Sequence, residues 1–170
     1  MLSDTIDKYL KLFKEAPNNN VRSRIGDEMR REFQNSPPSV DEVIQELEKY
    51  ALNPKYPGAS FVVRATWYNL SQDYLPILCQ ILNSESHNGL HENVIEILDE
   101  LRDERAVPAL SKALTYRWSY DFGLSVPKKA LLALAEFETP ETMMIIKEAT
   151  KSSEELIRDD ANLFLENLSD

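Results

Sequence analysis

The sequence has little glycine, one cysteine and no long hydrophobic run, and each shortage excludes a class of protein. Four glycines in 170 residues, with only short β-branched runs, argue against a strand-dominated fold. A lone Cys79 cannot form an internal disulfide, so we expect a reducing, cytoplasmic compartment. No apolar run approaches the roughly 20 residues that a membrane helix needs. The N-terminal segment MLSDTIDKYLKLFKEAP interleaves apolar and charged residues, so we expect no signal peptide.

Positive charge is also scarce, because 19 Lys and Arg face 29 Asp and Glu, for a formal charge of −10. The imbalance is uneven: residues 1–36 carry seven basic and six acidic side chains, and residues 37–170 carry twelve and twenty-three. An acidic body disfavours nucleic-acid phosphates and anionic membranes. We therefore expect neither nucleic acid nor membrane as a partner. The charge favours a basic protein partner, or serves solubility alone.

Helical periodicity runs through the whole chain. Apolar spacing predicts helices over residues 3–15 and 20–34, and Ser39 with Glu42 forms a capping box after them. Two series of apolar stripes then alternate. The first series begins its stripes at Ile44, Leu75, Val107 and Met143, at intervals of 31, 32 and 36 residues. The second begins its stripes at Val63, Val94, Ala130 and Ala161, at intervals of 31, 36 and 31 residues.

Two interleaved series of near-constant period indicate a two-helix repeat. The turns agree, because Pro76, Pro108 and Pro140 each fall in the first turn of a predicted first helix. One hairpin cannot bury its apolar stripe alone, so stacked hairpins must supply the core. We predict an all-α fold in a single domain of residues 1–170, made of about five stacked helical hairpins. Residues 1–36 form an irregular N-terminal hairpin, and residues 39–170 form four more.

The central segment carries a family resemblance. DERAVPALSKAL, residues 103–114, follows VIEILDEL and resembles the HEAT-like repeat of the type also found in phycobilin lyases. That family favours an acidic residue followed by Arg-Ala-Val-Pro-Ala-Leu at the turn between repeats. YLPILCQIL and TMMIIKEAT match it in pattern only, and residues 1–38 show no match. The resemblance implies a right-handed, armadillo-type α-solenoid, but such repeats serve scaffolds, lyase subunits, DNA-repair proteins and inhibitors alike.

In HEAT-like folds the second helix of each repeat lines the inner surface. On the predicted helix at 91–101 the apolar stripe faces the core, which leaves Glu92, Glu96 and Asp99 on the opposite side. The equivalent positions in neighbouring repeats are Phe61, Ala65 and Tyr68 before it, and Leu132 and Leu163 among those after it. We expect an acidic groove for a basic protein, with Tyr68 as an aromatic anchor. The alternative is an ordinary solvated helix face.

The segment TYRWSYDFGLS, residues 115–125, lengthens one repeat and holds four aromatic residues. These are Tyr116, Trp118, Tyr120 and Phe122. Large aromatic side chains either pack back on the repeat or bind a partner, and they are common anchors at interfaces. Loops on rigid scaffolds often carry function. We expect this loop to contact the partner, with packing as the open alternative.

Signals for catalysis are weak. His87 and His91 have the spacing of two metal ligands on a helix, but Asn88-Gly89 interrupts the segment and no third ligand is evident. Cys79 lies on an apolar face, where a buried inert thiol is the simplest interpretation. Trp67 and Leu70 continue the second apolar series from Val63, and Trp67 is interpreted as a packing residue. No phosphate loop or nucleophile elbow is present, so we expect no catalytic residue, metal or cofactor.

Together these features favour a non-catalytic protein-binding module. Its acidic helical-repeat surface and aromatic loop would suit an inhibitor or immunity protein that neutralises a basic partner such as a toxin domain. One alternative is a bilin lyase-like enzyme or subunit, which rests on the family resemblance alone. Another is a general intracellular scaffold.

Overall fold

The computed structural model describes residues 1–167, and within that range the side chains of His87 and Asn88 are not described. Every regular element in the described range is a helix, so the all-α prediction is confirmed. None of these helices is long and apolar enough to cross a membrane. The chain divides into two compact units, Met1–Ile77 and Leu78–Asp170, which we call unit 1 and unit 2.

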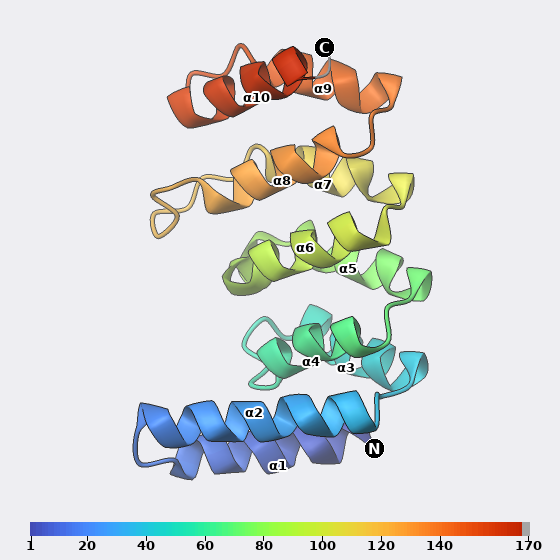
Figure 1. Cartoon of the computed structure of the whole chain (residues 1–170), viewed down its shortest axis with the longest axis vertical. Helices are drawn as coiled ribbons and strands as arrows, with labels where there is room; N and C mark the ends of the chain where they lie inside the picture. The colour runs from blue at the N-terminus through green and yellow to red at the C-terminus, as the bar shows by residue number, and fades with distance from the viewer. Residues whose placement is uncertain (168–170) are drawn as a thin grey trace. The chain divides into compact units, whose positions relative to one another are not determined.

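Unit 1 begins with a helical hairpin of α1 (Leu2–Glu15) and α2 (Asn19–Asn35), seen in Figure 1. The predicted boundaries, 3–15 and 20–34, are confirmed to within one residue at each end. The Asn18 side chain accepts a hydrogen bond from the Val21 N–H at 3.1 Å and caps α2. Each helix buries one stripe, made of Leu2, Ile6 and Tyr9 on α1 and Ile25, Met29 and Phe33 on α2.

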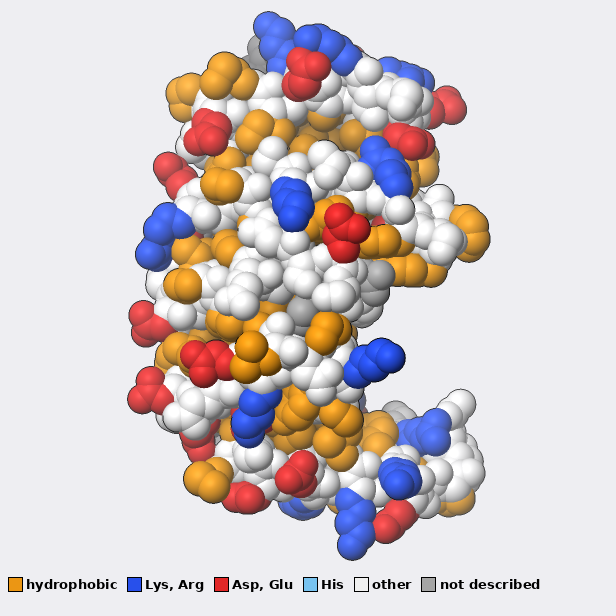
Figure 2. Space-filling model, turned by 180° about the vertical axis from the view of Figure 1, so that it is seen from behind, with side chains coloured by type: hydrophobic (Ala, Val, Ile, Leu, Met, Phe, Trp, Pro, Cys, Tyr) orange, Lys and Arg blue, Asp and Glu red, His pale blue; other side chains and the backbone are white. Residues whose placement is uncertain are grey.

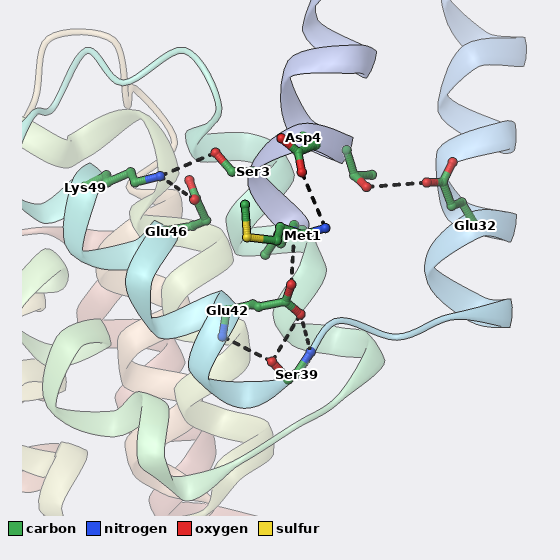
Figure 3. Close-up of polar contacts among 10 residues, drawn as sticks. Met1, Ser3, Asp4, Glu32, Ser39, Glu42, Glu46 and Lys49 are labelled. Atoms are coloured by element: carbon green, nitrogen blue, oxygen red, sulfur yellow. Dashed lines mark hydrogen bonds and ion pairs between the residues drawn. The ribbon is translucent and has the colours of Figure 1, made fainter.

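The second part of unit 1 pairs α3 (Val40–Leu52) with α4 (Ala59–Ala65). The predicted capping box is confirmed, because Ser39 Oγ accepts from the Glu42 N–H and Glu42 accepts from the Ser39 N–H. Figure 3 shows that Glu42 also accepts a hydrogen bond from the Leu2 N–H, at 3.1 Å. The Glu42 carboxylate therefore caps the N-terminus of α3 and also holds the N-terminus of α1 against it.

The register of α3 and the length of α4 differ from the prediction. On α3, Val43 is fully buried in place of Ile44. The helix α4 ends at Ala65, and the chain continues as the 3-10 helix η1 (Thr66–Tyr68). Because a 3-10 helix has about three residues per turn instead of about 3.6, the predicted stripe rotates away from the core.

The predictions for four residues around α4 are therefore wrong. Trp67 and Leu70 were assigned to the core but are 41% and 40% exposed. Phe61 and Ala65 are predicted to face away from the core, on the inner surface of the solenoid, but they are buried. Five of the seven residues of α4 are buried, so the helix packs against other elements on nearly all sides. A prediction based on one buried face therefore fails for this helix.

The boundary between unit 1 and unit 2 falls inside α5 (Leu75–Leu82), which follows the short 3-10 helix η2 (Gln72–Tyr74). Unit 2 continues with η3 (Glu85–Leu90), α6 (His91–Leu101), η4 (Glu104–Ala106) and α7 (Val107–Ala113). It ends with α8 (Ser125–Ala135), α9 (Pro140–Ala149) and α10 (Glu155–Asn167). Within unit 2, α8 is the central element, because it packs against α6, α7, α9 and α10 (Figure 1).

The core of unit 2 follows the predicted stripes closely. On α6 the expected stripe is buried, and Ile95 joins it. The stripe consists of Val94, Ile97, Leu98 and Leu101. Pro108 and Pro140 lie in the first turns of α7 and α9, as predicted, and Thr139 caps α9. Burial of these stripes orients α6 and α8 and so positions the surface described next.

Candidate protein-binding surface

The segment between α7 and α8 folds back onto the start of α6. Tyr116, its first aromatic residue, is only 4% exposed. The Tyr116 hydroxyl donates a hydrogen bond to the carbonyl of Leu82 at 2.8 Å. This residue therefore supports the loop from inside unit 2 and offers almost no area to a partner.

His91 forms the platform on which the loop rests. Its side chain is fully buried at the first position of α6. Since a carbonyl only accepts, the 3.0 Å contact between His91 Nε2 and the Ile81 carbonyl places a ring proton on Nε2. The ring also lies 5.5 Å from that of Tyr116, nearly parallel to it. His91 is thus engaged in packing, while the side chain of His87, its suggested partner in metal binding, lies outside the described residues.

Four rings continue this arrangement from the interior to the surface, and we call His91, Tyr116, Trp118 and Tyr120 the aromatic ladder. Trp118 stacks on His91 with centroids 5.0 Å apart, and Tyr120 stacks on Trp118 at 5.8 Å. Exposure rises outward, to 51% at Tyr120 and 90% at the neighbouring Phe122. The loop thus both packs and displays aromatic side chains. Figure 2 shows hydrophobic side chains projecting at the edge of unit 2 at the level of this loop.

The far end of the loop is held by Asp121. Asp121 as a residue is only 8% exposed, and its carboxylate accepts hydrogen bonds from the backbone N–H groups of Ser125 at 2.7 Å and Val126 at 3.1 Å. These donors would otherwise be unsatisfied at the first turn of α8. Because the ladder holds one side of the loop and this cap holds the other, Phe122 is displayed from a loop that is anchored at both ends.

The acidic residues of α6 lie beside a lysine that the sequence analysis did not anticipate. Lys129 of α8 lies 3.2 Å from a carboxylate oxygen of Glu92 and also pairs with Glu96. Burial alone would lower the pKa of Lys129, but its hydrogen bonds to Glu96 and Glu92 outweigh burial and raise that pKa. Two carboxylates therefore share one ammonium, which leaves a net negative charge at this point.

Asp99 lies further along α6, in a second cluster that contains both acidic and basic side chains. Burial raises the pKa of its carboxyl, while Arg102 lies 3.6 Å away and partly offsets this. Arg102 also binds Glu136 at 2.9 Å. The predicted acidic face is therefore a surface of mixed charge with a negative excess, rather than an uninterrupted acidic groove.

Tyr120 of the ladder lies within electrostatic range of Asp121 and of Glu92 on α6. Burial, followed by the negative charges of Asp121 and Glu92, raises the pKa of the Tyr120 hydroxyl. An exposed aromatic ring and a carboxylate thus lie within electrostatic reach of each other. We call Glu92, Glu96, Tyr120 and Phe122 the unit 2 patch.

Tyr68, the remaining residue predicted to bind a partner, belongs to unit 1. Its ring is half-buried and lies 5.4 Å from that of Phe33 on α2. The structure therefore groups the predicted residues of α6 and of the aromatic loop within unit 2 and places Tyr68 in a separate packing environment.

Sequence reasoning missed the contributions of Lys129 and Asp121. A signal for Lys129 was present, because it follows Glu96 by 33 residues, close to one repeat length. Residues one period apart lie on adjacent repeats, so a lysine at that spacing is placed to neutralise them. For Asp121 no periodic signal exists, since it lies in the inserted segment.

Comparison with known families supports the repeat assignment. Residues 91–116 match the family model of the PBS lyase HEAT-like repeat. The match covers α6, η4, α7 and the chain up to Tyr116, so this hairpin is a HEAT-like repeat, as the DERAVPALSKAL motif predicted. Among curated proteins, none matches the chain.

Proposed function

We propose that this chain is a non-catalytic protein-binding module, built as a right-handed HEAT-like solenoid of about five hairpins. The observation that carries the proposal is the aromatic ladder, because it presents Tyr120 and Phe122 to solvent from a buried platform. A side chain that is 90% exposed, as Phe122 is, gains free energy when a partner removes it from water. A loop held at both ends loses little entropy on binding.

The charge of the patch favours a basic partner. Unit 2 carries nine Lys and Arg against eighteen Asp and Glu, a net charge of −9, whereas unit 1 carries ten against eleven. An arginine of the partner would stack on the Tyr120 ring and form hydrogen bonds to Glu92. The negative excess would also steer the approach of a basic protein.

A narrower form of this proposal is a cytoplasmic inhibitor or immunity protein that covers a basic toxin domain. Small size and a formal charge of −10 support it. In this form the chain would act by occupying the partner's surface, so its own residues need no catalytic chemistry.

A bilin lyase-like enzyme or subunit is a second candidate, favoured by the family match at residues 91–116. Mixing the chain with free bilin and an apoprotein separates the two functions. Absorbance changes that report bilin transfer would favour the lyase, and their absence would leave the protein-binding module. A general intracellular scaffold would bind several partners without preference for a basic one.

The structure sharpens the test of the binding surface. Since Tyr116 and Trp118 support the loop, the informative variant is Tyr120→Ala combined with Phe122→Ala, which removes only displayed rings. Met144→Ala is a matched control, because Met144 is an exposed apolar residue elsewhere in unit 2. We expect wild type and the control to capture one basic protein stoichiometrically from native lysate, and the double variant to lose it. Equal capture by the double variant would remove the loop from the interface.

The charge contribution is tested with the purified partner. Glu92→Gln with Glu96→Gln should slow association at low ionic strength by about tenfold, with a smaller effect at high salt. Glu141→Gln with Glu155→Gln removes the same charge from exposed positions on other helices and should have a smaller effect. Equal slowing by both pairs would show that net charge, not the patch, steers binding.

A further inference from the structure

Unit 1 contains a cleft that the proposed function does not use. It lies between α1, α2 and α4 and has a volume of about 460 Å³. Sites for small ligands range from roughly 300 to 1,000 Å³ and are mostly apolar, with a few convergent polar groups. In Figure 2 the edge of unit 1 is hollowed, with hydrophobic side chains in the hollow and Lys and Arg beside it.

The floor of the cleft is apolar and well packed. Phe13 of α1 and Phe61 of α4 meet edge to face with ring centroids 5.5 Å apart. Met29 of α2 is 3% exposed, and Leu10 extends the floor along α1. Because three helices hold these side chains, the floor keeps its shape without a ligand.

Positive charge lies at the rim. Arg64 of α4 is exposed, and its guanidinium makes no hydrogen bond or ion pair with the part of the chain that the structure describes. Arg30 of α2 also lines the cleft, with its guanidinium paired to Asp27 on the same helix. The hydroxyl groups of Ser23 and Ser60 are further hydrogen-bond donors among the lining residues.

Gly26 keeps the cleft open. It lies inside α2, where glycine costs about 1 kcal/mol relative to alanine. A Cβ atom added there would meet only the Phe13 ring, at 3.8 Å, which is an ordinary contact. Packing within unit 1 therefore does not require glycine at this position, and a larger side chain would extend into the cleft.

We propose that this cleft binds a small amphiphilic anion, a carboxylate with an apolar body about the size of a medium-chain fatty acid. The body would cover the Phe13–Phe61 floor, and the carboxylate would bind Arg64 first and Arg30 second. A guanidinium offers two parallel N–H donors to a carboxylate, and such charge-assisted bonds are roughly twice as strong as neutral ones. A cationic or purely apolar ligand leaves Arg64 without this bond.

The test uses the full chain and decanoate below its micelle-forming concentration. Titration of ¹⁵N-labelled protein should give saturable amide shifts confined to α1, α2 and α4. Decanol and decyltrimethylammonium carry a similar apolar chain without the anion, and we expect each to bind at least about tenfold more weakly. Arg64→Gln should weaken decanoate binding about tenfold and leave decanol binding unchanged.

Two substitutions of Gly26 distinguish a blocked cleft from a misfolded protein. Gly26→Leu fills the cleft and should abolish decanoate binding, yet it raises helix propensity and should not lower the midpoint of urea unfolding. Gly26→Ala adds a single methyl group and should retain binding. The Tyr120→Ala, Phe122→Ala double variant should bind decanoate as wild type does, which makes this proposal independent of the protein-binding one.

Three results would overturn the proposal. They are the absence of saturable decanoate binding, equal affinity of wild type and Arg64→Gln for decanoate, and undiminished binding by Gly26→Leu. Shifts centred outside unit 1 would likewise show that the cleft is not the site.

Discussion

The imidazole of His91 stacks on the indole of Trp118, with ring centroids 5.0 Å and ring planes 14° apart. This contact joins the first residue of the HEAT-like repeat to an inserted loop that the family match does not cover beyond Tyr116. Since His91 is fully buried, the packing of α6 determines where Trp118 lies. The displayed residues Tyr120 and Phe122 are therefore positioned by the repeat.

Replacing His91 should loosen the loop in a way that depends on ring shape. His91→Leu removes both the stacking and the hydrogen bond to Ile81, and we expect a loss of about 2–4 kcal/mol in the free energy of unfolding. His91→Phe keeps a ring beneath Trp118 and should lose about 1–2 kcal/mol. Urea titration measures both losses.

Fluorescence separates loosening of the loop from general destabilisation. In a Trp67→Phe background, Trp118 is the single tryptophan. Its emission should shift to longer wavelength and become more open to acrylamide quenching in His91→Leu, but stay near the reference value in His91→Phe. Unchanged emission in His91→Leu would mean that the loop does not depend on this ring.

Asp103 should make the free energy of unfolding pH-dependent. The Arg105 side chain, and then the Arg105 backbone N–H, donate hydrogen bonds to its carboxylate and lower its pKa to about 2. The unfolded value is about 3.9. A depressed carboxyl pKa stabilises the fold above the unfolded pKa, and this contribution is lost as the pH falls from about 4 to about 2.

Asp103→Asn should therefore flatten the dependence of unfolding free energy on pH in that acid range. Glu104→Gln is the control, because Glu104 is an exposed neighbour in the same turn. In this variant the unfolding free energy should still fall between about pH 4 and about pH 2 because of Asp103. An identical slope in wild type and Asp103→Asn would contradict the role of the Arg105 contacts.

Cys79 should react slowly while the chain is folded. Burial, and then the negative charge of Asp103, raise the pKa of its thiol to about 11. Only the thiolate is nucleophilic, and a free thiol has a pKa of about 8.5. We expect Ellman's reagent at pH 8 to label the native chain about 100-fold more slowly than the chain in urea. Comparable rates in both states would indicate an accessible, activated thiol.

Glu138 offers a test of backbone strain between α8 and α9. It is exposed and adopts a left-handed conformation with φ of 51°. That conformation costs a residue with a side chain roughly 1–2 kcal/mol and costs glycine little. Glycine relieves the strain in the folded chain but also makes the unfolded chain more flexible, which opposes the gain. Glu138→Gly should therefore raise the free energy of unfolding by a net of about 0.5–1 kcal/mol. Glu138→Ala retains the strain, so equal effects of the two variants on urea unfolding would refute this explanation.

Helix positions and most apolar stripes were predictable from the sequence, because caps and side-chain spacing act over one to two turns. Ser39 and Glu42 illustrate this, since both halves of their capping box lie within four residues. The same reasoning failed at Trp67, where α4 passes into a 3-10 helix and the periodicity changes. Nothing in the local spacing marks that change.

Sequence alone determined the all-helical fold and the HEAT-like repeat at α6 and α7, since both depend on patterns repeated along the chain. Tertiary structure decided which aromatic rings of the loop are packed and which are displayed, because Tyr116 and Trp118 find their partners on elements before the loop. It also brought Lys129 to the acidic face of α6 and joined three helices around the cleft of unit 1. Such contacts bring together residues tens of positions apart, and their geometry depends on how helices pack, which local periodicity does not encode.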